Sequence, residues 1–498
     1  MPVPWRLFQA DRAGRHCVQP APSIELRLHL HGRQAKHVPL FVAAALGGIG
    51  CEPQLPRHRM MKNTSLVLSA CCLAMLSVGD NSTAVMAALP AMTRDLQLDS
   101  AAVEWVVNAY LLAAAVFILL GGEAADRFGA RRSSTAGIAL FALASLIIAL
   151  APSGIIVIGA RALQGLGAAF AVAGTLAAAT ESPESERAGA IAAWTGFLML
   201  GFSIGPLVGG AVTHYAGWRF NFWLNVLAIV PAAIMLAMRP GPPGRKADTL
   251  DWLGVWLLAV FMVSLILGLR SLPSIRSLPQ ATIVPAAVAI FAFAALIWAE
   301  RRHPQPLLDF NLLARANLIV ACAMAFVLMF GIMTLLLYYN LYAQAPEGLG
   351  MSAIAAGVSL LPLSVALFGF ARAAPRLSTS VGLQRMLAGG WLIFALGCLV
   401  LWASLAQAQP ALRYVGLFAI GAGIALPYAS APRIALAALP ETQSGKGSGL
   451  VNTCSFLGGT VGVTCGGVVF AFAGFPGVVV LLGLSALLGV GPALRVRA

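Results

Sequence analysis

Two charged side chains lie well inside long apolar stretches of this chain, more than one helical turn from either end, where a charge is costly to bury. Asp80 falls in the stretch 65–90 and Arg161 in the stretch 155–180. Burial favours the neutral form of a carboxyl group, so Asp80 is predicted to take up and release a proton near neutral pH. A lipophilic cation would compete with that proton for the ionised carboxylate. This competition is a physical basis for exchanging a proton for a cationic solute across the membrane.

Each of the two residues also has a simpler interpretation. Asp80 would then be a structural acid that is protonated or hydrogen-bonded, and Arg161 would be a side chain that reaches along the helix to the membrane surface. The apolar run around Arg161 begins at Ile155, more than one helical turn earlier. That depth favours a functional position for Arg161.

Aromatic side chains in other apolar stretches offer a binding surface for such a cation, because the face of an aromatic ring attracts positive charge. The candidates for a substrate cavity are Trp105, Tyr110, Trp194, Tyr338 and Phe456, with Phe202 and Tyr339 as further members of the set. The alternative for each of them is plain packing or anchoring at the membrane interface.

A short charged segment, which we call the charged loop, separates two of the apolar stretches. It reads Gly122-Glu-Ala-Ala-Asp126-Arg127-Phe-Gly129-Ala-Arg131-Arg132. Such a segment cannot lie in hydrocarbon, and its excess of arginine predicts the cytoplasmic face. Its acid and arginines could form an ion-pair cluster that joins helix ends in one conformation and breaks in another. The alternative is a positively charged anchor with a tight turn at Gly129.

The composition indicates a membrane protein. Of the 498 residues, 59% are hydrophobic and 10% are charged, and the mean hydropathy is +0.85. A soluble domain is about one quarter charged. The net charge of +14 raises the question of a nucleic-acid partner, but the basic residues stand singly between apolar stretches, so none is expected. The eight cysteines form no metal-ligand pattern, and no nucleophile–base set indicates an enzyme.

Fourteen apolar stretches are long enough to cross a bilayer, and each must then be helical. They are expected at 65–90, 103–123, 133–152, 155–180, 189–213, 218–238, 251–271, 280–299, 317–340, 353–373, 384–405, 411–431, 448–472 and 475–496. Loops on one side carry seventeen Arg and Lys residues, and loops on the other side carry five. This bias predicts a multi-pass protein of the bacterial cytoplasmic membrane with both termini in the cytoplasm.

A glycine pattern occurs twice along the chain. Gly201-x-x-x-Gly205-Pro206-x-x-Gly209-Gly210 recurs 257 positions later as Gly458-x-x-x-Gly462-Val463-x-x-Gly466-Gly467. Gly165-x-Gly167 recurs 256 positions later as Gly421-x-Gly423. Matches in order at nearly one offset indicate an internal repeat. Small residues every four positions also allow close helix packing, and Pro206 allows a bend. Packing without functional meaning is the alternative for this pattern.

The repeat predicts the domain organisation. The expected fold is an all-α membrane protein of two six-helix bundles, residues 62–240 and 317–498, with an inserted helix pair in 241–316. In such an arrangement the substrate site lies between the bundles, near the middle of the membrane. Residues 1–61 are expected to be a disordered tail, or to precede a native start at Met60 or Met61.

Taken together, these motifs resemble the fourteen-helix drug:proton antiporters of the major facilitator superfamily, the multidrug and quaternary-ammonium exporters. The resemblance covers residues 62–498. It rests on the charged loop, Arg161 to Gly167, the glycines of 201–210, and the segments 88–90, 104–110, 218–225 and 251–254. It implies a major-facilitator fold, coupling through Arg161, gating by the charged loop, and the helix-5 glycines as a motif tied to exchange.

The resemblance also implies the partners. It implies export of small amphipathic molecules across a lipid bilayer by alternating access, with no cofactor beyond the proton as coupling ion. Transporters of this kind usually act as monomers, which accessory export proteins can join.

The chain departs from the family pattern in its first helix. That pattern is D-x-T-I-V-N-V-A-L-P, and alignment on Ala88-Leu89-Pro90 puts the acid position on Asn81, with Asp80 one residue earlier. A shift of one residue turns a side chain by roughly 100° around a helix. Asp80 and Asn81 are therefore both candidates for coupling. No acid lies within the spans of 317–498, so monocations or neutral lipophiles are the expected cargo.

Two other functions are compatible with the same scaffold. One is export of a dedicated metabolite or siderophore. The other is a membrane sensor that has lost transport, for which the altered first-helix motif leaves room. The intact charged loop and Arg161 argue against the sensor.

Overall fold

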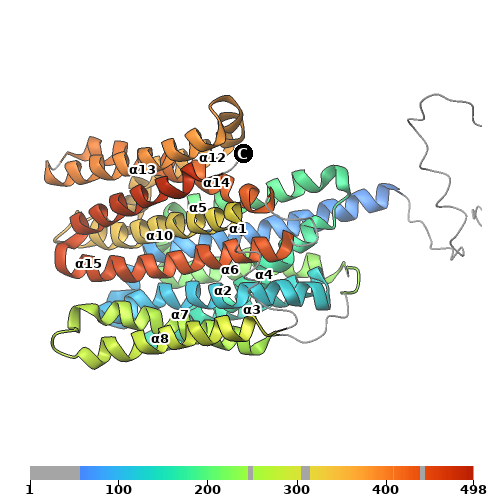
Figure 1. Cartoon of the computed structure of the whole chain (residues 1–498), viewed down its shortest axis with the longest axis horizontal. Helices are drawn as coiled ribbons and strands as arrows, with labels where there is room; N and C mark the ends of the chain where they lie inside the picture. Colours follow the sequence, from blue (N-terminus) through green and yellow to red (C-terminus); the bar gives the residue numbers. More distant parts are fainter. Residues whose placement is uncertain are drawn as a thin grey trace, which may run out of the picture. The chain divides into compact units, whose positions relative to one another are not determined.

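The computed structural model describes residues 57–239, 241–244, 251–303, 315–407, 409–437 and 444–496. Throughout these residues the regular secondary structure is helical (Figure 1). A helix satisfies its own backbone donors and acceptors, as a chain surrounded by lipid requires. The all-α membrane fold expected from the sequence is confirmed. The expectation for residues 1–61 lies outside the described residues except at 57–61.

Six helices form what we call the first half, and six elements form the second half. The first half comprises α1 (Arg57–Leu96), α2 (Ser100–Phe128), α3 (Ala130–Ala149), α4 (Gly154–Thr180), α5 (Glu184–Ala216) and α6 (Trp218–Ala237). Between the halves stand α7 (Trp252–Ser271), the 3-10 turn η1 (Leu272–Ser274) and α8 (Pro279–Glu300). The second half comprises α10 (Ala316–Gln344), α11 (Ala353–Ser359), α12 (Leu361–Ser380), α13 (Leu383–Ala406), α14 (Pro410–Ala437) and α15 (Ser444–Leu494).

The described residues contain thirteen helical spans that are long and apolar enough to cross a membrane. Two details reconcile this number with the fourteen expected stretches. The elements α11 and α12 form one span, Ala353–Ser380. The last span, Gly449–Leu494, is 46 residues long and breaks at Gly474, where φ is +60°. Its two arms correspond to the two stretches predicted at 448–472 and 475–496.

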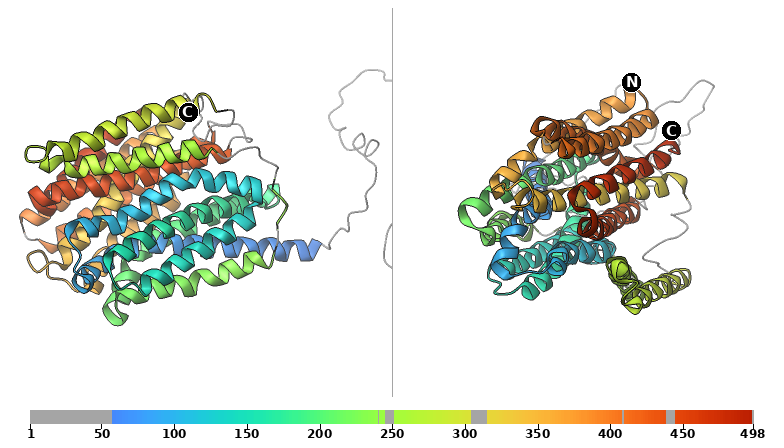
Figure 2. Two further views of the ribbon diagram at one scale, coloured as in Figure 1. Left: turned by 90° about the horizontal axis from the view of Figure 1, so that it is seen from below. Right: turned by 90° about the vertical axis from the view of Figure 1, so that its left-hand side faces the viewer.

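The helices of each half pack in the same pattern. In the first half α1 packs against α5, α2 against α4, and α3 against α4 and α6; in the second half α10 packs against α15, α12 against α14, and α13 against α14 and α15. The halves meet where α2 contacts α15 and where α5 contacts α11. The α7–α8 hairpin lies at the margin of the bundle, with α7 against α2 and α15 (Figure 2).

Individual contacts follow the sequence repeat. Gly201 in α5 packs directly on the backbone of α1 at Leu76, and its copy Gly458 in α15 packs on the backbone of α10 at Phe326. In the same way α4 packs on α3 through Gly167, and α14 packs on α13 through Gly423. The glycines recur because each copy must bring the same two pairs of helices into backbone contact.

Replacing Gly205 by valine is expected to destabilise the protein, because α1 leaves no space for a side chain there. A methyl group on Gly205 would lie 2.8 Å from the carbonyl oxygen of Asp80. Overpacking of this kind costs about 1–3 kcal/mol. Thermal unfolding of the purified protein in detergent measures the loss. Gly196→Val in the same helix is the matched control, since nothing lies within 4 Å of a methyl group at that position. Equal unfolding temperatures for the two variants would contradict this account of the packing.

Candidate functional site

Arg161 is fully buried in α4 and binds α2. Its Nε donates a hydrogen bond to the carbonyl oxygen of Val106 at 2.9 Å. Its guanidinium lies over the ring of Tyr110, 4.3 Å from the centroid, in a cation–π contact. Among the described residues Arg161 forms no ion pair. The positive charge is therefore stabilised by a carbonyl dipole and an aromatic face of α2 and by a side-chain amide.

That amide belongs to Gln164, one turn further along α4, and it extends the contacts of Arg161 to three more helices. Arg161 Nη1 donates to Gln164 Oε1 at 2.6 Å. Gln164 Nε2 in turn donates to Ser145 Oγ of α3 at 2.7 Å and, more weakly, to Asn81 Oδ1 of α1 at 3.4 Å. Asn225 Nδ2 of α6 donates to the same Asn81 oxygen at 2.8 Å. We call these five residues the polar network. It connects α1, α3, α4 and α6, and Arg161 adds α2.

Two buried nitrogen atoms of the polar network have no hydrogen-bond partner within the described residues. They are Arg161 Nη2 and Asn81 Nδ2. A buried donor without an acceptor is costly, about 1–3 kcal/mol, and calls for an explanation. Both atoms are available to an acceptor oxygen on water or on a solute that enters the bundle.

Asp80 does not join the polar network, although it adjoins Asn81. Gly79 packs on the backbone of α5, whereas Asn81 binds α4 and α6. Successive residues of a helix are about 100° apart, so Asp80 faces between these two directions. Its Oδ1 is buried and has no hydrogen-bond partner among the described residues. The structure thus places Asn81, which stands at the position of the family acid, beside Gln164 in the polar network. Asp80 lies outside that network.

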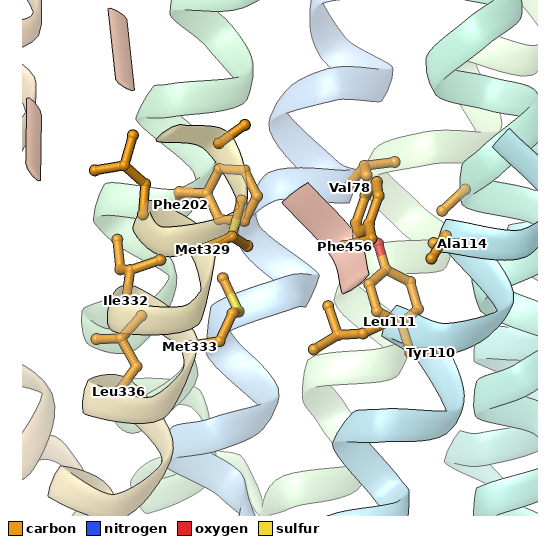
Figure 3. Close-up of a cluster of buried hydrophobic side chains, with 14 of the residues drawn as sticks. Val78, Tyr110, Leu111, Ala114, Phe202, Met329, Ile332, Met333, Leu336 and Phe456 are labelled. Atoms are coloured by element: carbon orange, nitrogen blue, oxygen red, sulfur yellow. The ribbon is translucent and has the colours of Figure 1, made fainter. Parts of the chain in front are cut away.

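An apolar crevice lies between the halves. Its lining comes from α5 of the first half and from α10, α12 and α14 of the second: Met199, Phe202, Met329, Ile332, Leu367, Ile424 and Tyr428. Figure 3 shows Phe202 beside Met329, and Phe456 of α15 beside Tyr110 and Leu111 of α2. The crevice as it stands has room for about one water molecule, so a larger solute would require its flexible methionines and aromatic rings to move apart.

The five aromatic residues predicted for a cavity lie in different surroundings. Tyr110 and Phe456 belong to the buried apolar core (Figure 3), and the Tyr110 hydroxyl also accepts a hydrogen bond from Ser82 Oγ of α1 at 3.2 Å. Trp194 and Tyr338 use their polar atoms within one half: Trp194 Nε1 donates to Thr175 Oγ1 at 2.9 Å, and the Tyr338 hydroxyl donates to the carbonyl oxygen of Val463 at 2.7 Å. Trp105 is partly buried and packs against the core. The role of each in a cavity stays a prediction.

The charged loop ties helix ends of the first half together. Gly129, at φ +94°, is the single residue between α2 and α3. Arg131 forms an ion pair with Glu181 at the end of α4, with Nη2 2.8 Å from Oε2, and its Nη1 donates to the carbonyl oxygen of Arg239 after α6 at 3.1 Å. The sequence did not single out Glu181, whose position is 50 residues away.

The other members of the charged loop lie nearer the surface of the protein. Gly122 and Arg127 are half-buried, and Asp126 and Arg132 are exposed. The backbone of Gly244 packs on the carbonyl oxygen of Arg127. A gate that joins the two halves through this loop stays a prediction.

The helix-5 glycines serve both sides of α5. Gly201, Gly205 and Gly209 pack on α1. Gly210 packs on Ala353 of α11, and the carbonyl oxygen of Pro206 meets Gly357 of the same helix. The motif therefore holds α5 in its own half and also forms part of the contact with the second half.

Sequence reasoning missed several polar residues that the structure brings into play. Gln164 and Asn225 lie inside motifs on which the resemblance rests. An amide side chain within an apolar stretch was the feature that could have identified them as buried polar residues. Asn108 of α2 donates through Nδ2 to Thr464 Oγ1 of α15 at 3.0 Å, which is a hydrogen bond between the halves. No local pattern could reveal that its partner lies 356 residues later.

Glu104 is a further carboxylate within a span that sequence reasoning did not single out. It lies in the Ser100–Phe128 span with a side-chain exposure of 14%, and its Oε2 is 3.8 Å from Arg270 Nε of α7. The apolar stretch was expected to begin at 103, which made Glu104 a residue of the helix start. In the structure α2 begins at Ser100, capped by Asp99, and Glu104 is one turn further in.

Comparison with known proteins identifies relatives that cover most of the chain. A family model described as the Major Facilitator Superfamily matches residues 70–463. "Multidrug resistance protein Stp" of Mycobacterium tuberculosis (strain CDC 1551 / Oshkosh) is 30% identical over 415 residues, which are 83% of this chain and 77% of that protein. "Tetracenomycin C resistance and export protein" of Streptomyces glaucescens is 28% identical over 81% of this chain and 75% of its own. "Quinolone resistance protein NorB" of Staphylococcus aureus (strain COL) is 26% identical over 87% and 96%.

Replacing Arg161 by lysine is expected to destabilise the first half even though the charge is kept. A single ammonium group cannot reach both Val106 and Gln164 and also lie flat on Tyr110. Loss of one charge-assisted hydrogen bond costs about 1.5–3 kcal/mol. Thermal unfolding and solute transport by the purified variant measure the effect. The exposed Arg132→Lys is the control, and an Arg161→Lys protein that matches it in both assays would show that the polar network does not need the guanidinium.

Proposed function

The chain belongs to the major facilitator superfamily, and from this premise we propose that it is a proton-coupled antiporter that exports lipophilic or cationic drugs by alternating access. It is a multi-pass membrane transporter and not an enzyme. The observation that carries the proposal is the pair of adjacent residues in α1. Asp80 offers a buried carboxyl oxygen without a partner, and Asn81 belongs to the polar network around Arg161.

Proton coupling acts through α1 in this proposal. A carboxyl group among apolar neighbours is stable when neutral and becomes costly when it ionises. A change of its charge therefore changes how α1 packs on α5, where Gly79 and Gly201 are in backbone contact. Because α1 also contacts α10 of the second half, such a shift reaches the boundary between the halves.

The boundary between the halves supports alternating access. Hydrogen bonds across it include Asn108 to Thr464 at 3.0 Å and Gln344 Nε2 to the carbonyl oxygen of Ala87 at 3.0 Å. Small residues make close contacts elsewhere along it, with Gly210 on Ala353 and Gly357 on Pro206. Surfaces of this kind separate at little electrostatic cost, so rocking of one half against the other can open either side.

The apolar crevice supports lipophilic cargo. It is lined by the side chains of Met199, Phe202 and Met329, which would repack around an aromatic or amphipathic solute as the halves move apart. The relatives named for resistance to multiple drugs and to quinolones favour a broad range. The relative named for tetracenomycin C export favours the narrower alternative, a dedicated metabolite. Broad export predicts resistance to a panel of dyes and biocides in a pump-deleted strain, whereas dedicated export predicts resistance to one compound class.

The proposal includes the bacterial cytoplasmic membrane as the location, with both termini inside and the charged loop on the cytoplasmic face. The arginine bias of the loops supports this orientation. A fluorescent protein fused after the C-terminus would fluoresce in the cytoplasm and would stay dark if this end were exported. A monomer is the proposed working unit, with the proton as the coupling ion.

Replacing Asp80 by asparagine is expected to abolish ethidium accumulation driven by a pH gradient in liposomes, because an amide cannot exchange a proton. Ethidium fluorescence after an imposed pH jump measures this accumulation. Asp99→Asn is the matched control: Asp99 caps α2 through the backbone nitrogen of Ala102, and asparagine caps equally well. Gradient-driven accumulation that Asp80→Asn leaves unchanged would remove Asp80 from the mechanism.

A further inference from the structure

Glu104 lies where three parts of the molecule meet. It belongs to α2 of the first half, and Arg270 of the inserted α7 faces it at 3.8 Å. On the other side Gly467 of α15, in the second half, packs directly on the Glu104 carboxylate. The Tyr338 hydroxyl of α10 adjoins the same glycine, 2.7 Å from where a methyl group would stand. A carboxylate is thus held in the contact between the halves.

The internal repeat shows that this contact does not require a carboxylate for packing. The caps of α2 and α11 are Asp99 and Ser352, 253 positions apart, and the same step leads from Glu104 to Gly357. Gly357 packs on the backbone of α5 at Pro206. One of the two related contacts between the halves is therefore made of backbone and small residues alone. The other contains an acid.

The charge of Glu104 is only partly compensated. Within the described residues Arg270 is the charged side chain that faces it, and no ion-pair partner comes from α1, α3 or α4. The other titratable groups nearby are the Tyr338 hydroxyl of α10, which donates to Val463, and the Cys465 thiol of α15. The distance of 3.8 Å is too long for a hydrogen bond to Arg270, so Glu104 Oε2 is buried without a hydrogen-bond partner among the described residues.

We propose that Glu104 is a second proton-binding carboxylate of the transport cycle, with Arg270 of the inserted helix pair as its counter-ion. This inference rests on the proposed proton-coupled function. The ionised carboxylate attracts Arg270 and keeps α7 drawn against α2 at the contact with α15. A proton from the aqueous side neutralises the carboxylate and removes that attraction. The contact between α2 and α15 can then open at this end.

The position along α2 fits such a role. Glu104 and Phe128 are 24 residues apart, which is about 36 Å at the helical rise. Glu104 thus lies near the end of α2 opposite the charged loop, where α2 of the first half meets Gly467 of α15 in the second. In this proposal the inserted helix pair has a role in coupling, because α7 supplies the counter-ion for Glu104. The second repeat copy has glycine in place of this carboxylate.

Two transport measurements on the full-length protein in liposomes test the inference. One is ethidium accumulation driven by a pH gradient, and the other is ethidium counterflow without a gradient. Glu104→Gln is expected to keep counterflow and to lower gradient-driven accumulation by about tenfold, with a flatter pH profile. Asp99→Asn, which keeps the cap of α2 and lies outside the proposed site, is expected to behave like the wild type. The carboxylic-acid carbonyl stretch in pH-difference infrared spectra should lose one component in Glu104→Gln.

The outcomes separate this inference from the function on which it rests. A wild-type protein that shows no gradient-driven accumulation overturns the proposed function itself. A coupled wild type with an unchanged Glu104→Gln pH profile and infrared spectrum overturns the role of Glu104 alone. Should Glu104→Gln fail to fold, Arg270→Gln decides: without the counter-ion the neutral acid is favoured, so the midpoint of the pH profile must move to higher pH. An unmoved midpoint contradicts the inference.

Discussion

The cost of placing the Arg161 guanidinium in the middle of a membrane-spanning bundle governs the assembly of the first half. Water cannot solvate this charge, so α2 contributes a carbonyl oxygen and the ring of Tyr110, and Gln164 contributes its amide. Gln164 then needs partners of its own and finds them in α3 and α1. One buried charge thereby specifies how several helices face each other. Apolar packing alone would leave their rotation poorly defined, because lipid is as apolar as the side chains.

The two halves share a packing scheme but not a chemistry. The step that relates Gly165 to Gly421 takes Arg161 to Leu417 and Gln164 to Ile420, which are both fully buried. The place of the polar network is therefore apolar in the second half. Glu104 and its counterpart Gly357 repeat this asymmetry at the contact between the halves. The two halves can still move as similar bodies, because their helices pack in the same pattern.

Close backbone contact is the complementary constraint. Gly201, Gly205 and Gly209 let α5 lie directly on α1, which brings Asp80 next to the helix that also touches α11. A change of charge at Asp80 is thus close to a contact between the halves, although Asp80 itself does not line the apolar crevice. The coupling that we propose between proton and cargo would therefore pass through the position of α1 and α5.

The sequence by itself determined the helices, their number, the internal repeat and the family, because hydropathy and glycine spacing are local properties that lipid makes nearly obligatory. It also indicated Arg161 and Asn81. Only the tertiary structure decided which side chains meet. The partners Asn81 and Asn225 are 144 residues apart, and Arg131 and Glu181 are 50 apart. Whether Asp80 or Asn81 reaches Gln164, and whether Glu104 faces water or Arg270, depends on the rotation of each helix against its neighbours. That rotation is set by the sum of many contacts and is not written in any single stretch of residues.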